Sequence, residues 1–225
     1  KTRFSCIEPD KQDQHHLFGH RHTSLKPSIA KNEPTRHQLF ANLLNVKYHT
    51  IMKTLAVLLQ SIGIEDAMQD DSILIQTISQ HSKQCKPNSV FFAFHGLRTD
   101  GILYIQEAIE HGAVCIISDQ DLSKLPIPAH ISWHQVKKPH TAFACMCSAF
   151  YDRPQDKLGI IGVSGTDGKS TTCDYLYQLL QKNGVKAGLL TTVSIDDGST
   201  KVDSPYRQST PEPDQLHAFL HRCVE

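Results

Sequence analysis

The chain has 225 residues, of which 39% are apolar and 20% are charged, a composition typical of globular proteins. Its 23 Lys and Arg balance its 23 Asp and Glu, so bulk charge does not favour attraction to nucleic acid or to a membrane surface. No apolar run approaches the ~18 residues of a membrane span. The 7 cysteines form no C-x-x-C pair, which favours reduced thiols and a cytoplasmic protein over a disulfide framework.

Residues 1–51 are polar and basic, contain several prolines and show no sustained period. This composition predicts a leader or extension that is mostly disordered. The His-rich stretch 15–22 has the chemistry of transition-metal ligands, but a leader without fixed geometry does not favour a metal site. Met52 opens an apolar stretch that resembles a secretory signal but stops at Gln60, which favours a first helix instead. The residues expected to face inward from this helix are Leu55, Leu58, Leu59 and Ile62.

Strands and helices alternate over residues 52–154, and this pattern predicts an α/β domain. Buried strands are expected at 90–94 and 113–117, and a weaker strand at 131–133. A helix that Gly112 ends lies between the first two strands, and a second helix runs from Pro139 to about Tyr151. The inward face of the first of these helices comprises Ile102, Ile105, Ala108 and Ile109.

A second unit is expected over residues 155–225, beginning with a strand at 158–163, a turn, and a helix at 171–182. The apolar stripe of that helix is Leu176, Leu179 and Leu180, and Gly184 follows as its C-terminal cap. A further strand at 187–193 completes a β-turn-α-β unit, which predicts a parallel sheet with a right-handed crossover. A polar, turn-rich segment and a helix at 211–224 follow. Two parallel strands do not bury both faces of a sheet, so we expect the N-terminal part of a longer protein.

The turn between the strand and the helix of this unit reads GVSGTDGKSTT, residues 162–172. Small residues before a helix leave backbone N–H groups free, and the helix dipole adds positive potential for a phosphate. Gly165 and Gly168 permit close approach of an oxyanion, Lys169 can reach the β- and γ-phosphates, and Ser170 can hold Mg²⁺. The standard P-loop has Gly where this chain has Val163, so a Gly-rich turn with a solvent-facing lysine remains the alternative.

The same residues resemble the P-loop variant of the Mur ligases and folylpolyglutamate synthetases, G-[TS]-G-T-[ND]-G-K-[ST]-T-T, which lacks the early glycine. Asp167 stands where Asn is common. The resemblance implies that Lys169 is catalytic and that Ser170 is a Mg²⁺ ligand. It also implies an ATP site formed by Gly165, Thr166, Asp167, Gly168, Lys169, Ser170 and Thr171.

The first domain resembles the N-terminal domain that MurE-type and MurF-type ligases share. The resemblance lies in residues 85–96, in Thr99-Asp100-Gly101, and in Ala108 with Gly112-Ala113. In that family this domain holds the UDP part of a UDP-N-acetylmuramoyl peptide. The implied substrate-binding residues here are Ser82, Leu97, Arg98 and Thr99. His81-Ser82-Lys83 stands at the usual Asp-Ser-Arg, so the serine is kept, the acid before it is absent, and Lys replaces Arg.

Residues 188–193, followed by Ser209-Thr210-Pro211-Glu212, resemble the MurE pattern G-x-x-x-T-[VI] followed by T-T-P-E. The resemblance implies that Ser209 and Thr210 contact the muramoyl-peptide substrate near the γ-phosphate. A structural alternative is a helix N-cap at Ser209 or Thr210 with Pro211 in the first turn. Both interpretations can hold together.

The resemblance implies a small α/β UDP-binding domain followed by the start of a P-loop ATPase domain with a parallel sheet. It implies an ATP- and Mg²⁺-dependent monomer that joins a diamino acid to UDP-N-acetylmuramoyl-L-Ala-D-Glu through an acyl phosphate. The family's later metal ligands, carbamylated lysine and specificity domain would lie beyond Glu225, so we expect no ligation by this chain alone. The alternatives are a MurF-like or cyanophycin-type ligase, a non-catalytic nucleotide-binding remnant, or a UDP-sugar-binding module.

Overall fold

The computed structural model describes residues 51–225 apart from 66–71, 97–98, 200 and 207. These residues belong to one compact unit, Thr35–Glu225. The expected leader and its His-rich stretch therefore lie outside the described residues, with the exception of Ile51. Ile51 is partly buried and packs against a hydrophobic core of the domain that follows, so this last position of the expected leader belongs to the folded part.

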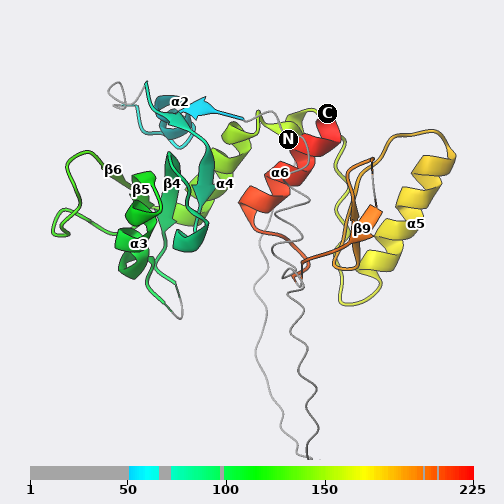
Figure 1. The fold of residues 1–225 in the computed structure, drawn as a ribbon. Helices are drawn as coiled ribbons and strands as arrows, with labels where there is room; N and C mark the ends of the chain where they lie inside the picture. The colour runs from blue at the N-terminus through cyan, green and yellow to red at the C-terminus, as the bar shows by residue number, and fades with distance from the viewer. Residues whose placement is uncertain (1–50, 66–71, 97–98, 200, 207) are drawn as a thin grey trace, which may run out of the picture. The chain divides into compact units, whose positions relative to one another are not determined.

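A four-stranded parallel sheet organises the first part of the chain (Figure 1). Its strands are β3 (Thr77–Ser79), β4 (Ser89–Ala93), β5 (Ala113–Ser118) and β6 (Ser132–Gln135), and their order in the sheet is the order in the chain. All neighbouring pairs are parallel, with Ile78 beside Val90 and Ile117 beside His134. Every strand therefore ends at the same edge of the sheet, and the loops that leave this edge lie close together.

One face of the sheet is covered by α2 (Leu55–Gln60) and α4 (Pro139–Phe150). The expected inward residues Leu55, Leu58 and Leu59 are fully buried, and Ile62 is partly buried. A short antiparallel pair that the sequence did not predict, β1 (Lys53–Thr54) and β2 (Leu74–Ile75), adjoins α2. Phe92 and Phe143 meet edge to face with their ring centroids 5.0 Å apart. This face therefore forms the larger core of the first part.

The other face is covered by η3 (Gly101–Tyr104), α3 (Ile105–Glu110) and the segment from Leu122 to Ile131. The expected helix over 102–109 is thus present, with its first turn in the tighter 3₁₀ form. Gly112 ends it with φ 101°, and a Cβ at this position would lie 2.7 Å from Pro87 Cα. Only glycine fits both requirements, which accounts for the residue between α3 and β5.

The strands expected in the second part differ from those in the structure. Residues 158–163 form no strand, and Ile160 and Ile161 are 57% and 63% exposed. The residues expected as a strand at 187–193 form only β7 (Leu189–Leu190), which pairs antiparallel with β8 (Ser194–Asp196), as does β9 (Lys201–Asp203). The predicted parallel pair is therefore wrong within the described residues. A strand needs a neighbouring strand to bond its backbone N–H and C=O groups. Among the described residues, 158–163 have no such neighbouring strand.

Helix α5 (Lys169–Lys182) forms as expected, but its apolar stripe is not a core face. No residue of α5 is buried, and Leu179 is 58% exposed. Polar contacts join the helix to the β8–β9 hairpin instead. Tyr177 donates a hydrogen bond of 2.6 Å to Asp196, and Lys201 lies 2.7 Å from Asp174.

Helix α6 (Pro213–Val224) ends the chain and packs against α4 and η4 (Pro154–Asp156). Its Ala218 and Phe219 are buried, and the Phe219 side chain packs with Ile195 of the hairpin. Its Arg222 pairs with Asp197 at 3.0 Å, with only 7% of the arginine side chain exposed. The helix is therefore in contact with both parts of the described chain.

Candidate functional site

A pocket of about 510 Å³ lies at the edge of the parallel sheet where β3 and β4 end. Loops that follow parallel strands are the usual place for a ligand in such sheets. Its walls come from residues after β3, residues after β4, and one side of η3 and α3. The lining residues are Gln80, His81, Ser82, Lys83, Gln84, Phe94, Gly96, Thr99, Gly101, Tyr104 and Glu107.

Two of the expected substrate-binding residues, Ser82 and Thr99, line this pocket although they are 17 positions apart in the sequence. Leu97 and Arg98 lie outside the described residues. Ser209 and Thr210 are exposed and do not belong to the pocket lining. The structure thus brings Ser82 and Thr99 to one pocket, whose lining does not include Ser209 and Thr210.

Ser82 is oriented by a residue that the sequence did not single out. It is buried in η2 (Ser82–Gln84), and its hydroxyl donates a hydrogen bond to Glu107 Oε2 on α3. Because the proton points at Glu107, the oxygen lone pairs of Ser82 remain available to accept a hydrogen bond. The charged rim at this side comes from Lys83, which is exposed next to the buried serine.

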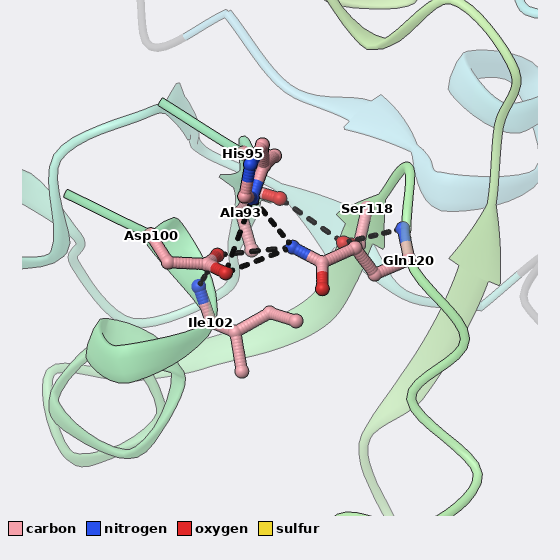
Figure 2. Close-up of polar contacts among 6 residues, drawn as sticks. All are labelled: Ala93, His95, Asp100, Ile102, Ser118 and Gln120. Atoms are coloured by element: carbon pink, nitrogen blue, oxygen red, sulfur yellow. Dashed lines mark hydrogen bonds and ion pairs between the residues drawn. The ribbon is translucent and has the colours of Figure 1, made fainter. Parts of the chain in front are cut away.

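The other wall of the pocket is held by a polar network centred on Asp100 (Figure 2). Gln120 Nε2 donates to Asp100 Oδ1 at 3.0 Å and to Oδ2 at 3.1 Å. Asp100 also accepts the Ile102 N–H at 3.1 Å, and His95 Nδ1 lies 3.2 Å from its Oδ2. The hydrogen bonds from Gln120, then from Ile102 and His95, hold the pKa of the Asp100 carboxyl below its usual value. Asp100 is therefore a well-satisfied carboxylate.

Two glycines let the chain pass tightly beside this network. A Cβ on Gly101 would lie 2.6 Å from Phe94 N, and a Cβ on Gly96 would lie 2.5 Å from Thr99 O. Gly101 N–H donates to Phe94 O at 2.7 Å, and Gly96 N–H donates to Thr99 O at 3.2 Å. Sterics thus explain why glycine follows Asp100. The close approach of Gly96 to the Thr99 carbonyl places both of these residues on the pocket wall.

The loop before α5 has the backbone geometry of an anion cradle. Gly168 adopts φ 78°, in the left-handed region, directly before the first residue of the helix. Gly165 adopts φ 153°. The free N–H groups of the first helical turn follow, where the helix dipole is positive. This geometry fits a phosphate and gives the two glycines of the motif a physical role.

Lys169 does not extend into solvent, as an ordinary turn would allow. Its ammonium donates to Gly165 O at 2.5 Å and to Thr166 O at 2.9 Å. Its side chain therefore returns over the loop, where bound phosphates would meet it. Ser170 Oγ lies 3.3 Å from Thr192 Oγ1, which brings a hydroxyl from beyond β7 beside the proposed Mg²⁺ ligand. Thr166, Asp167 and Thr171 are exposed on the same segment.

The start of α6 differs from the helix N-cap that the sequence suggested at Ser209 or Thr210. The N-cap of α6 is Glu212, which has an extended backbone, and Pro213 is the first helical residue. Neither Ser209 nor Thr210 caps the helix, because the helix begins later than expected. Their exposed hydroxyls leave a contact with substrate as the interpretation that stays a prediction.

Within the described residues, no three His, Cys, Asp or Glu side chains are grouped closely enough to hold a metal ion. Among the same residues, no helix is long and apolar enough to cross a membrane.

A family model described as "Mur ligase family, catalytic domain" matches residues 74–151, which comprise β2, the parallel sheet and α4. The fold is also similar to a solved structure of a UDP-N-acetylmuramoyl-L-alanyl-D-glutamate--2,6-diaminopimelate ligase. The TM-score is 0.53 at 17% identity, over 75% of this chain and 33% of that one. The chain belongs to the Mur ligase family.

Curated relatives more than 30% identical to the chain are named as synthetases of the UDP-N-acetylmuramyl tripeptide or as 2,6-diaminopimelate ligases. The UDP-N-acetylmuramyl-tripeptide synthetase of Borreliella afzelii (strain PKo) is 42% identical over 155 residues, which are 67% of this chain and 30% of that protein. The UDP-N-acetylmuramoyl-L-alanyl-D-glutamate--2,6-diaminopimelate ligase of Alkaliphilus metalliredigens (strain QYMF) is 34% identical over 168 residues, or 75% of this chain and 33% of that protein. The matched part of the chain thus spans about a third of these relatives, 30% of the first and 33% of the second.

Proposed function

We propose that the chain is the substrate-binding and first ATP-binding portion of an ATP-dependent amide ligase of peptidoglycan precursor synthesis. The ligase would add a diamino acid to UDP-N-acetylmuramoyl-L-Ala-D-Glu. One observation carries the proposal: Ser82 and Thr99, from separate loops, meet in one pocket in a chain that is 42% identical to a tripeptide synthetase.

The chemistry of the pocket supports a uridine diphosphate ligand. Phe94 and Tyr104 offer aromatic surface for a flat base, while Ser82 and Thr99 offer hydroxyls for its polar edge. Lys83 adds a positive charge suited to a diphosphate. Apolar surface with a few convergent polar groups is the usual composition of a small-molecule site.

The geometry of the loop 162–172 supports an ATP site, which follows the pocket residues in the sequence. The left-handed Gly168, the N–H groups of the first turn of α5 and the returned Lys169 ammonium together fit a chain of phosphates. Ser170 and the neighbouring Thr192 would contact Mg²⁺, which supplies charge neutralisation on the phosphates when it is bound.

In the proposed reaction, the substrate carboxylate attacks the γ-phosphorus of ATP, which forms an acyl phosphate and releases ADP. The amine of the diamino acid then attacks the acyl carbon, forms the amide and releases phosphate. Lys169 would offset negative charge on the transferring group, and the pocket would fix the nucleotide end of the substrate. The contribution of this chain is positioning and charge neutralisation.

Isothermal titration of the 225-residue chain with UDP, and separately with ATP, tests the proposal. We expect UDP to bind, and Ser82→Ala to weaken it about tenfold, the value of one hydrogen bond of ~1.4 kcal/mol. Ser123→Ala is the matched control, because the N–H and hydroxyl of Ser123 donate to Asp121 and Ser123 does not line the pocket. No binding of UDP contradicts the proposed pocket, and binding of UDP without ATP favours a UDP-sugar module.

We further propose that the protein is cytoplasmic, because its proposed substrates are nucleotide-linked precursors and ATP. The resemblance to the Mur ligases also implies a monomer. Sedimentation equilibrium tests the oligomeric state, and fractionation of cells tests the compartment. A stable dimer, or recovery in the membrane fraction, would contradict these two statements.

A further inference from the structure

Gln120 makes a bifurcated hydrogen bond to a carboxylate, and this contact takes no direct part in the proposed reaction. Its side-chain amide donates to both carboxylate oxygens of Asp100, at 3.0 and 3.1 Å (Figure 2). The same nitrogen lies 3.4 Å from His95 Nδ1. Gln120 follows β5, whereas Asp100 and His95 lie between β4 and η3. The contact therefore joins the carboxyl ends of two neighbouring strands.

The backbone of Gln120 is itself anchored to the sheet. Its N–H donates to Ser118 Oγ at 3.1 Å, and the buried Ser118 hydroxyl donates to Ala93 O at 3.0 Å. Ala93 ends β4, so the chain of contacts starts and finishes on the rigid sheet. Because the backbone of Gln120 is anchored to the sheet, its side chain restricts the position of the Asp100 carboxylate.

Neither Gln120, Asp100 nor His95 belongs to the pocket lining, but residues directly beside them do. Gly96 follows His95 and Thr99 precedes Asp100, and Gly96 and Thr99 are joined by a backbone hydrogen bond of 3.2 Å. His95 and Asp100 also form an antiparallel bridge. Fixing the Asp100 carboxylate therefore fixes the pocket wall at Gly96 and Thr99.

We propose that Gln120 and Asp100 are positioning residues that pre-organise Gly96 and Thr99 for the uridine diphosphate ligand. The inference rests on the proposed function, since that function supplies the ligand. Pre-organisation raises affinity by removing the ordering cost that a loose wall would add on binding.

This role differs from a stabilising one in what it predicts. The Asp100 side chain is 31% exposed, and partly exposed polar pairs contribute little to the free energy of unfolding. Loss of the pair should therefore change ligand affinity much more than global stability. The Ile102 N–H contact of Asp100 begins η3 and is retained when only Gln120 is changed. Variants of Gln120 consequently separate the positioning role from the capping role.

The first variant is Gln120→Ala, which removes the amide and leaves Asp100 and Ile102 in place. Its matched control is Gln106→Ala, because Gln106 is an exposed glutamine whose amide donates to the exposed Glu110. The second variant is Gln120→Glu, which keeps the shape and places a carboxylate against Asp100. The third combines Asp100→Asn with Gln120→Glu and so exchanges donor and acceptor across the same pair.

We expect UDP to bind Gln120→Ala about tenfold more weakly than the unaltered chain and Gln120→Glu more weakly still. The exchanged pair should recover most of the loss in Gln120→Glu, while Gln106→Ala stays within about twofold. Thermal midpoints should be nearly unchanged for Gln120→Ala. Unaltered UDP affinity in Gln120→Ala, or no recovery in the exchanged pair, would overturn the positioning role.

Hydrogen exchange separates failure of this inference from failure of the proposed ligand. In Gln120→Ala the amides of Gly96 and Gly101 should exchange at least about tenfold faster, while the amides of β4 stay protected. If the unaltered chain does not bind UDP, the proposed pocket function fails, and exchange alone decides whether Gln120 holds the wall. Unchanged exchange at both glycines in Gln120→Ala would overturn the inference whether or not UDP binds.

Discussion

At the scale of single residues, Lys169 and Gly101 illustrate two different reasons for a residue's identity. At Lys169 the charge and the length of the side chain matter. Its ammonium donates hydrogen bonds to backbone carbonyls of the loop that would surround the phosphates. Gly101 is defined by space, because a Cβ there would meet Phe94 N at 2.6 Å and Phe94 O at 2.7 Å. A substitution at the first should change chemistry, and one at the second should change stability.

In the intact ligase, Lys169→Ala should lower kcat/KM at least about 10²-fold, or ~3 kcal/mol, because a pre-organised cation is lost from the phosphates. Phosphate release is the measurement. Val163→Gly is the comparison, since this loop lacks the early glycine of the standard motif. Outside a helix or strand, the greater freedom of glycine in the unfolded chain should cost at most about 1 kcal/mol of stability. Near-normal turnover in Lys169→Ala, with loss of turnover in Val163→Gly, would contradict the phosphate cradle.

Gly101→Ala should destabilise the parallel sheet by about 2–3 kcal/mol, because the new methyl group meets backbone atoms rather than a movable side chain. Urea unfolding followed by fluorescence measures this, and Trp133, the 1 Trp of the chain, lies in β6. Gly162→Ala is the control, because nothing lies within 4 Å of its added Cβ. Equal midpoints for both variants would contradict the tight approach.

At the scale of elements, three of the four strands of the parallel sheet were predicted from the sequence, whereas β3 and the hairpin were not. Strands β4 and β5 are apolar along their length because both faces of the sheet are covered, and the apolar runs at 90–94 and 113–117 marked them. The hairpin β8–β9 lies in a polar stretch that the sequence indicated as turns. Asp197-Gly198 at its bend was the available signal.

From the sequence, the residues of the candidate site were predictable only where they belong to a recognisable motif. Ser82, Thr99 and the loop before α5 came from a resemblance to known ligases, and the structure places the first two in one pocket. Glu107 and Gln120 were missed because their partners meet them only through the sheet: Ser82 and Glu107 are 25 positions apart, and the Ser118–Ala93 contact that supports Gln120 also spans 25. Sequence spacing carries no record of such contacts.

The polar contact between α5 and the hairpin gives a prediction about pH. Burial and the hydrogen bond to Asp196 raise the pKa of Tyr177 to about 12. The folded state therefore favours the protonated phenol, so its contribution to stability is complete below pH ~10 and is lost as pH rises towards 12. Absorbance titration of tyrosinate should show a late-titrating group that Tyr177→Phe removes. An ordinary titration of Tyr177 would contradict the contact.

At the scale of the whole molecule, the chain should divide under proteases at the segment after α4. Lys157 is exposed there, whereas Pro154 protects the bond after Arg153 from trypsin, and no strand follows until β7. We expect trypsin to cut first before about residue 52 and again near 153–157, leaving the parallel sheet protected. Mass spectrometry identifies the fragments. Persistence of the uncut chain, or first cleavage inside 77–150, would contradict the proposed boundaries.

The 225-residue chain by itself should bind UDP without releasing ADP. Residues 158–163 have no strand partner among the described residues, and α5 buries no side chain, so the ATP loop lacks the rigid support that catalysis needs. A coupled assay with ATP, UDP-N-acetylmuramoyl-L-Ala-D-Glu and a diamino acid measures ADP. Release of ADP that depends on both other substrates would contradict this expectation.

The sequential order of the parallel strands has a consequence for inheritance. Because β3, β4, β5 and β6 lie in the sheet as they lie in the chain, the loops at their carboxyl ends are consecutive in the gene. All lining residues of the pocket fall between Gln80 and Glu107, and the supporting Gln120 follows shortly after. The proposed nucleotide site is thus one contiguous stretch of sequence that a single recombination event can transfer whole, together with the residues proposed to position it.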